Sequence, residues 1–168
     1  MEAIAGGFGL PTHDAAAKIA LYEQRVNSLY DLVESAIRRL EPGATFVRTS
    51  PVKIDEQLTG PYSVPSLEVS IPGKMGIRFI PKGIYNIGAR GRVDARSRLG
   101  TEVVVWVEKG GPVLTVTARK DEDELESSTL PVFPGVPEGW AWMDEKAVEL
   151  LPLTEDTLID RVLPKLVA

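Results

Sequence analysis

Few residues in this sequence have the types and spacing that enzyme chemistry requires. His13 is the only histidine in the 168 residues, and it falls in the first turn of an expected helix, where we interpret it as an ordinary polar residue. A serine nucleophile would need that histidine or a lysine as its base, and no Gly-x-Ser-x-Gly elbow is present to position one. The glycines around Phe8 and those of 88–91 match neither a phosphate loop nor a dinucleotide fingerprint. The sequence therefore predicts no catalytic residue and no cofactor.

Metal binding is also not expected. The chain has no cysteine, which excludes disulfides, iron–sulfur ligation and thiolate zinc sites. The acidic stretch 120–128 lacks the alternating ligands and the glycine of an EF-hand loop. We interpret this stretch, and the proline-punctuated segment that follows it to Gly139, as a long solvated loop.

The most distinctive feature is a predicted polar sheet face rich in arginine. Period-two spacing places four arginines of the segment 89–98 on one side, together with Asp94. Asp94 and Glu102 are interpreted as members of a charge ladder, because neighbouring arginines favour the ionised carboxylate. Arg92 over Trp106 would form a cation–π contact. The face is either a solvated ladder of cross-strand pairs or a recognition surface, since arginine and tryptophan are enriched at binding hot spots. The candidate binding residues are Arg90, Arg92, Asp94, Arg96, Glu102, Trp106 and Arg119.

Hairpins must position these side chains. A three-residue loop, Pro72-Gly73-Lys74, predicts that Leu67 pairs with Phe79 and that Glu68 lies opposite Arg78. A second three-residue loop at 98–100 would set Arg90 beside Glu108, Arg92 beside Trp106 and Arg96 beside Glu102.

A third hairpin is expected to follow directly. A two-residue turn, Gly110-Gly111, would pair the strand 101–108 with the strand 112–119 and place Glu102 between Arg96 and Arg119. Residues 140–143 supply a last strand, in which Trp140 and Trp142 share one side. Whether these two tryptophans extend the polar face or lie in the core is left open.

Two helices complete the pattern. Apolar residues recur at three- and four-residue steps from Ile19 to Leu40, with Thr12 or Asp14 as the cap, which predicts a long amino-terminal helix. The same spacing matches a dimer seam. Thr154 is predicted to cap a short final helix that Pro164 disturbs in its last turn.

These elements define the expected fold and its class. We predict a flexible arm at 1–12 and one α+β domain at 13–168, in which both helices pack on one face of an antiparallel meander of five to seven strands. A net charge of −5 disfavours nucleic acid, and neither a leader nor an apolar span is recognisable, so a cytoplasmic protein without membrane contact is expected.

Two functions fit this sequence. The first is a non-catalytic module that binds a protein partner through the Arg/Trp face, with a homodimer through the amino-terminal helix as an additional expectation. The alternative is a domain that binds an anionic small molecule, or an atypical enzyme, with a pocket between helix and sheet that uses Tyr85, Asp94 and the arginines as its polar groups.

Overall fold

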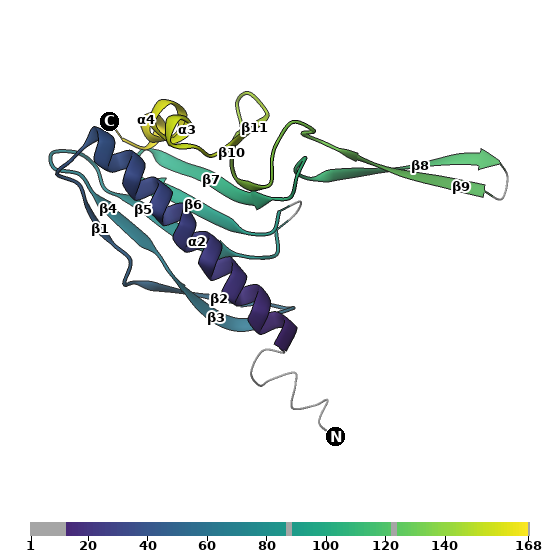
Figure 1. Ribbon diagram of the computed structural model, residues 1–168, viewed down its shortest axis with the longest axis horizontal. Helices are drawn as coiled ribbons and strands as arrows, with labels where there is room; N and C mark the ends of the chain where they lie inside the picture. The colour runs from purple at the N-terminus through teal and green to yellow at the C-terminus, as the bar shows by residue number, and fades with distance from the viewer. Residues whose placement is uncertain (1–12, 87–88, 122–123, 168) are drawn as a thin grey trace, which may run out of the picture.

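The computed structural model describes residues 13–86, 89–121 and 124–167, so the predicted arm at 1–12 and the proposed cap Thr12 lie outside the described residues. The fold is α+β: a long helix near the amino terminus and a short one near the carboxyl terminus accompany a seven-stranded antiparallel sheet (Figure 1). In sheet order the strands are β1 (Thr45–Val47), β4 (Leu67–Ser70), β5 (Ile77–Gly83), β6 (Arg92–Ser97), β7 (Gly100–Val107), β10 (Gly139–Asp144) and β11 (Glu149–Pro152). The fold class predicted from the sequence is confirmed.

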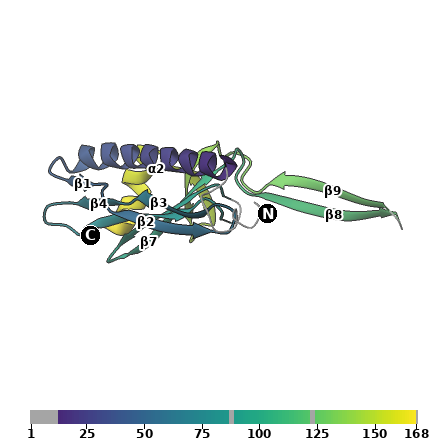
Figure 2. The ribbon, with the colours of Figure 1, turned by 90° about the horizontal axis from the view of Figure 1, so that it is seen from below.

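The long helix α2 spans His13–Leu40 and lies across one face of the sheet, here called the helix face (Figure 2). Its apolar stripe is buried in the main core together with side chains of the strands. The stripe residues are Tyr22, Val26, Leu29, Tyr30, Val33, Ala36 and Ile37. Because the chain's own sheet occupies this stripe, the expectation of a dimer seam along the helix is wrong.

The short carboxy-terminal helix packs on the same core. It consists of α3 (Glu155–Thr157), η1 (Leu158–Val162) and α4 (Leu163–Leu166), and Thr154 caps it by accepting a hydrogen bond from the backbone N–H of Thr157. The predicted cap is therefore confirmed. The middle segment is a π-helix, in which the N–H of Leu163 reaches back to the carbonyl of Leu158. Proline cannot donate a backbone hydrogen bond, and the widened π-turn lies immediately before Pro164. The helix is therefore disturbed close to this proline, as predicted.

The β4–β5 hairpin has the predicted register. Leu67 pairs with Phe79, Glu68 with Arg78, and Val69 with Ile77. The charged pair lies at 3.8 Å between Arg78 Nε and Glu68 Oε1.

The β6–β7 hairpin differs by one residue from the prediction. Ser97 pairs with Gly100, so the loop is the two residues Arg98-Leu99 rather than 98–100, and Arg92 pairs with Val105 instead of Trp106. Gly100 is the first residue of β7. Its φ is 151°, a backbone conformation that residues other than glycine rarely adopt. A shift of one residue turns each side chain of β7 to the other side.

The predicted pairing of 101–108 with 112–119 is also wrong. β10 takes the place beside β7, with Trp140 opposite Trp106 and Trp142 opposite Val104. The strand β10 brings two tryptophans to the core, whereas 112–119 has only small or β-branched side chains on its predicted inner side, apart from Leu114. Burial of the larger aromatic area favours β10 at this position.

The displaced segment forms a separate two-stranded arm, β8 (Val113–Asp121) paired with β9 (Glu124–Pro131). This arm projects from the body of the fold, the rest of the described chain (Figure 1). The expectation of a loop from 120 to 139 is therefore wrong for the β9 residues. A second hairpin, β2 (Pro51–Glu56) with β3 (Gly60–Pro65), contributes Ile54 and Val64 to the main core.

Candidate functional site

The seven residues predicted to share one polar face lie in three places. Arg92, Asp94 and Arg96 lie opposite Val105, Val103 and Thr101 on the side of the sheet away from α2, here called the far face. Glu102 and Trp106 lie on the helix face, and Arg90 lies beside Trp106 and α2. Arg119 lies on the arm, paired with Leu125 near its outer end. The single Arg/Trp face is therefore wrong, because the β6–β7 register is shifted by one residue and because β10 replaces 112–119 beside β7.

On the far face, Arg92 and Asp94 form a bidentate ion pair. The distances are 2.7 Å from Arg92 Nε to Asp94 Oδ1 and 3.1 Å from Nη2 to Oδ2. The Asp94 hydrogen bond is the main cause of a raised pKa for the Arg92 guanidinium. Asp94 is buried, and both of its carboxylate oxygens bind the same arginine, which is the geometry of a structural ion pair.

Glu102 and both tryptophans of β10 belong to the helix face. The Nε1–H of Trp142 donates to Glu102 Oε2 at 3.0 Å, so this carboxylate serves a core tryptophan rather than the two arginines predicted beside it. Trp140 and Trp142 are both buried, which settles their placement in the core.

Trp106 forms a cation–π contact, although with a different arginine from the predicted one. The guanidinium carbon of Arg25, on α2, lies 4.2 Å from the centre of the Trp106 ring. Trp140 meets the same indole edge-on at 5.7 Å, and its Nε1–H donates to the Arg25 carbonyl at 2.8 Å. Arg25 is thus held by its backbone and by its side chain.

This contact forms one wall of a cavity of about 340 Å³, here called the α2 cavity, between α2, the β5–β6 connection and β7. Three of its lining residues are cationic and two are anionic. The polar and aromatic lining residues are Lys18, Arg25, Arg90, Glu108, Glu138, Tyr22, Tyr85 and Trp106.

Two of the three cations are paired inside the protein. Arg90 Nε lies 3.3 Å from Glu108 Oε1, which confirms the predicted neighbourhood of these two residues. Lys18 Nζ lies 3.2 Å from Asp14 Oδ2 and 5.8 Å from the centre of the Tyr85 ring. The hydrogen bond from Lys18 to Asp14 is the main cause of a raised lysine pKa.

Arg25 differs from these two cations. Among the described residues it has no carboxylate within 4.0 Å, and partial burial lowers the pKa of its guanidinium. The Trp106 Nε1–H is buried and has no hydrogen-bond partner among the described residues. Two donors of the cavity wall are therefore without an acceptor inside the described part of the chain.

Glu56 fixes the β5–β6 connection that closes the cavity. Its carboxylate accepts the backbone N–H groups of Ile84 and Tyr85 at 2.9 to 3.2 Å and the Tyr62 hydroxyl at 2.5 Å. Tyr22, on α2, accepts the Gly83 N–H at 3.2 Å, and burial raises the pKa of its hydroxyl. The wall that carries Tyr85 is thus anchored to β2 and to α2.

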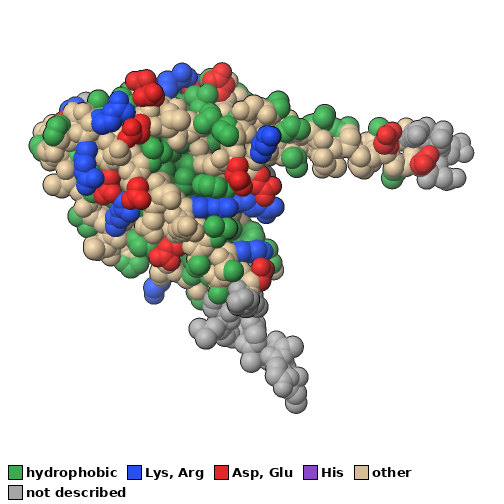
Figure 3. All heavy atoms as spheres, viewed as in Figure 1, with side chains coloured by type: hydrophobic (Ala, Val, Ile, Leu, Met, Phe, Trp, Pro, Cys, Tyr) green, Lys and Arg blue, Asp and Glu red, His purple; other side chains and the backbone are tan. Residues whose placement is uncertain are grey.

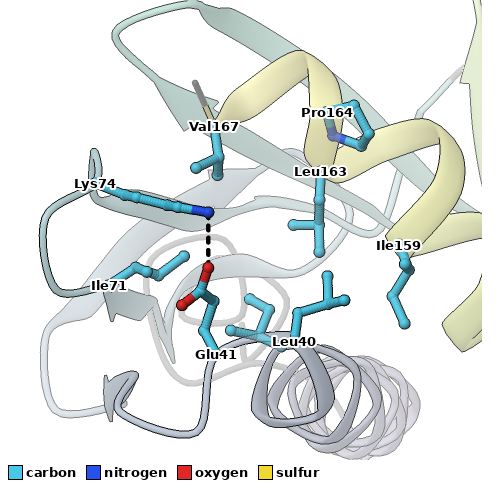
Figure 4. Close-up of a pocket in the computed structure, with 9 residues that line it drawn as sticks. Leu40, Glu41, Ile71, Lys74, Ile159, Leu163, Pro164 and Val167 are labelled. Carbon is cyan, nitrogen blue, oxygen red and sulfur yellow. Dashed lines mark ion pairs between the residues drawn. The ribbon is translucent and has the colours of Figure 1, made fainter.

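A second, smaller cleft of about 160 Å³ lies where the carboxy-terminal end of α2 meets the last helix. Figure 4 shows its side chains, which are mostly aliphatic, with Glu41 and Lys74 at one side. These two residues bind each other at 2.7 Å. The cleft offers an apolar space with its flanking charges already paired.

The arm is the most apolar exposed part of the described chain. Of the twelve large hydrophobic residues recorded as exposed, six lie between 113 and 132. They are Val113, Leu114, Val116, Leu125, Leu130 and Val132. Figure 3 shows hydrophobic side chains along the arm and acidic ones close to its outer end. This is the opposite of the polar surface expected of a solvated loop.

The described part of the chain has neither a helix that could span a membrane nor a cluster of metal-ligating side chains. No described helix has the length and apolar character needed to cross a bilayer. Within 13–86, 89–121 and 124–167, no three metal-ligating side chains of the histidine, cysteine or carboxylate types cluster together.

Comparison with known proteins gives one partial similarity. No family model matches the chain, and no solved structure matches it. An alignment over 96 residues, which covers 49% of this chain, shows 33% identity to a phosphoglycerate kinase of Thermosipho africanus. The chain spans only 22% of that enzyme's length.

The sequence held a weak signal for the α2 cavity. The sequence indicates Tyr85 for a pocket between helix and sheet and sets Arg90 beside Glu108. It does not indicate Arg25, because the role of Arg25 depends on Trp106 facing α2, and the predicted register turns this tryptophan to the other face. The alternation of Leu114, Val116 and Ala118 is visible in the sequence, but it predicts a buried strand, whereas these side chains are exposed.

Proposed function

We propose that this protein is a non-catalytic interaction module and that its arm, β8 with β9, pairs with the arm of a second copy of the chain. The observation that carries the proposal is the concentration of exposed aliphatic side chains on a projecting two-stranded ribbon. Isolated hairpins are marginally stable in water, and large exposed apolar patches mark interaction sites. The partial similarity to a phosphoglycerate kinase carries no part of this proposal, because it covers 22% of that enzyme.

The outer edge of β8 is suited to strand pairing. In the described residues β8 pairs with β9 alone, so its other edge presents backbone N–H and C=O groups without a ladder partner. Residues 113–119 contain no proline and no acidic residue. The β9 edge is less suitable, because Glu124 and Glu126 would repel their copies and Pro131 cannot donate a hydrogen bond.

The sequence of β8 is complementary to itself in an antiparallel pair. With Val116 on a two-fold axis, Val116 would meet Val116 of the second copy, and Leu114 would meet its Ala118. Thr115 would lie opposite Thr117, and Val113 opposite Arg119. No like charges meet, and the acidic outer ends lie at opposite ends of the four-stranded ribbon. A contact of the same surface on both chains is the usual form of a two-fold dimer.

The absence of cysteine permits a direct test by cross-linking. In this register the two V116C positions lie directly across the axis, within the ~4.4 to 6.8 Å Cα separation that a disulfide requires. Under mild oxidation we expect V116C to form a covalent dimer, detected on a non-reducing gel. The matched control is S128C, because Ser128 is the β9 partner of Val116. In the four-stranded ribbon its two copies would be separated by three strand spacings, roughly 14 Å, and should not cross-link.

Analytical ultracentrifugation of the full chain tests the non-covalent dimer. We expect the wild-type chain to be dimeric at about 100 μM and V116K to be monomeric, because V116K places two ammonium groups on the axis. V47K is the control, since Val47 is a strand valine on the body with a similar exposed fraction, 45% against 41% for Val116. A wild-type chain that stays monomeric, or equal dimerisation of V116K and wild type, would disprove arm pairing.

A further inference from the structure

The α2 cavity combines a guanidinium that lacks an ion-pair partner with an aromatic wall. The guanidinium carbon of Arg25 lies 4.2 Å from the centre of the Trp106 ring, and among the described residues no carboxylate lies within 4.0 Å of this arginine. Its N–H groups can therefore donate two parallel hydrogen bonds to a carboxylate. The Trp106 Nε1–H is covered by protein atoms, so Trp106 contributes its ring rather than a donor.

The charges of the cavity favour an acceptor with no more than one negative charge. Lys18 and Arg90 form ion pairs with Asp14 and Glu108, so the lining charges that remain are Arg25 and Glu138. Burial lowers the pKa of the Arg25 guanidinium and Glu138 partly offsets this through space, although no ion pair within 4.0 Å joins the two residues. A doubly charged phosphate would face repulsion from Glu108 and Glu138, whereas a carboxylate matches the planar edge of the guanidinium.

The size and the aromatic side chains define the rest of the ligand. A volume of about 340 Å³ lies within the ~300 to 1,000 Å³ range of small-molecule pockets. Tyr85 and Trp106 line the cavity and offer ring surfaces to a planar apolar body. The walls are also preformed, because Glu56 and Tyr22 hold the β5–β6 connection and Trp140 holds the backbone of Arg25.

We propose that the α2 cavity binds a small monocarboxylate with a planar, apolar body, through the Arg25 guanidinium and the Trp106 ring. This site is separate from the arm and does not depend on arm pairing. It assigns Arg25 the carboxylate and Trp106 a ring contact.

The three tryptophans provide a specific measurement. Each indole N–H gives one signal in a ¹H–¹⁵N spectrum. The N–H groups of Trp140 and Trp142 already donate hydrogen bonds to Arg25 and Glu102. The Trp106 signal is assigned as the one that W106F removes. We expect benzoate and phenylacetate to shift this signal along a saturable curve, and their neutral analogues benzamide and phenylacetamide to bind at least tenfold more weakly.

Matched arginine variants separate the site from general anion binding. R25Q should weaken benzoate binding at least tenfold, R25K should restore part of it, and R39Q should leave it unchanged, because Arg39 lies at the other end of α2. Retention of the dispersed spectrum shows that each variant is folded. The proposal is overturned if benzoate and benzamide shift the Trp106 signal equally, if R25Q binds like wild type, if inorganic phosphate binds more tightly than benzoate, or if no probe shifts the signal at about 20 mM.

Discussion

The body and the arm of this protein are both built on antiparallel hairpins, but the body buries its apolar residues and the arm exposes them. The β6–β7 hairpin lies under α2, and Val93, Ala95 and Val104 are completely buried there. The β8–β9 hairpin has strands of comparable length with every side chain that can be described exposed. Since burial of apolar area is the main source of stability, the body can fold by itself, whereas the arm lacks a cover.

The polar groups show the same contrast. Ion pairs of the body hold separate elements together, as Arg39 of α2 does with Glu155 of α3 at 3.1 Å. Among the described arm residues no ion pair is recorded, and the side-chain hydrogen bond there joins Thr117 and Ser127 at 3.1 Å. The arm is therefore held by its backbone ladder and little else. The arm therefore offers exposed apolar surface to a partner, whereas the body has buried most of its own. For this reason we place the interaction on the arm.

Truncation of one large side chain in each region is expected to give the largest difference in the free energy of unfolding. Trp142 is 0% exposed and Leu114 is 56% exposed. W142A should lower the free energy of unfolding by about 3 to 5 kcal/mol, because it leaves a cavity in the core and removes the donor to Glu102. L114A should change it by no more than about 0.5 kcal/mol. Urea denaturation at a protein concentration where the chain is monomeric measures both, and similar losses for the two variants would contradict the contrast.

The parts of the fold that local sequence determines were predicted correctly. The β4–β5 register follows from a short loop and from the alternation of Leu67, Val69, Ile77 and Phe79 with Glu68 and Arg78. In β7 the pattern does not specify the register, because Val103 and Val105 alternate with Val104 and Trp106 and either side can be buried. Its true neighbour β10 begins more than 30 residues further along the chain. Pairing at that separation depends on the total apolar area buried, which no local pattern contains.

The candidate sites were only partly predictable for the same reason. Arg90 with Glu108 could be placed from neighbouring strands. Arg25 lies on a helix that crosses the sheet, so its contact with Trp106 depends on helix position and strand register together. The arm could not be predicted for a different reason. The glycine pair 110–111 is typical of a tight hairpin turn, so the sequence predicts that 112–119 folds back on 101–108. In the structure both glycines have positive φ, yet the chain leaves the sheet there, with the Gly110 N–H bound to the Val136 carbonyl at 2.7 Å.

Acid titration extends the contrast to charged groups. Burial of Asp144 in the body would raise its pKa, but the N–H groups of Ala147 and Lys146 and the nearby Lys165 and Arg161 outweigh this, and the net pKa lies below the ordinary 3.8. A lowered pKa in the folded state contributes stability that is present above the unfolded pKa, about 4, and is lost as the pH falls through the folded value.

Two variants test this contribution. D144N should lower stability at pH 7 and reduce the loss between about pH 5 and pH 2, because the amide does not titrate. E126Q is the matched control, because it makes the same carboxylate-to-amide change on the exposed surface of the arm. Urea midpoints at several pH values measure both effects. If the urea midpoint of D144N depended on pH in the same way as that of wild type, the Asp144 carboxylate would make no contribution to the pH dependence of stability.

The smallest expected effect on the body is that of removing the arm completely. Pro112 and Val132 are joined across its base, with the Val132 N–H donating to the Pro112 carbonyl at 2.8 Å, so a two-residue Asn-Gly turn can replace residues 113–131. Under monomeric conditions the shortened chain should unfold within about 0.5 kcal/mol of wild type, since every arm side chain that can be described is exposed. At high concentration only wild type should gain stability, because dimerisation stabilises the folded state by mass action. If the shortened chain instead lost several kcal/mol as a monomer, the arm would belong to the folding unit, and its exposed aliphatic side chains would no longer require a partner.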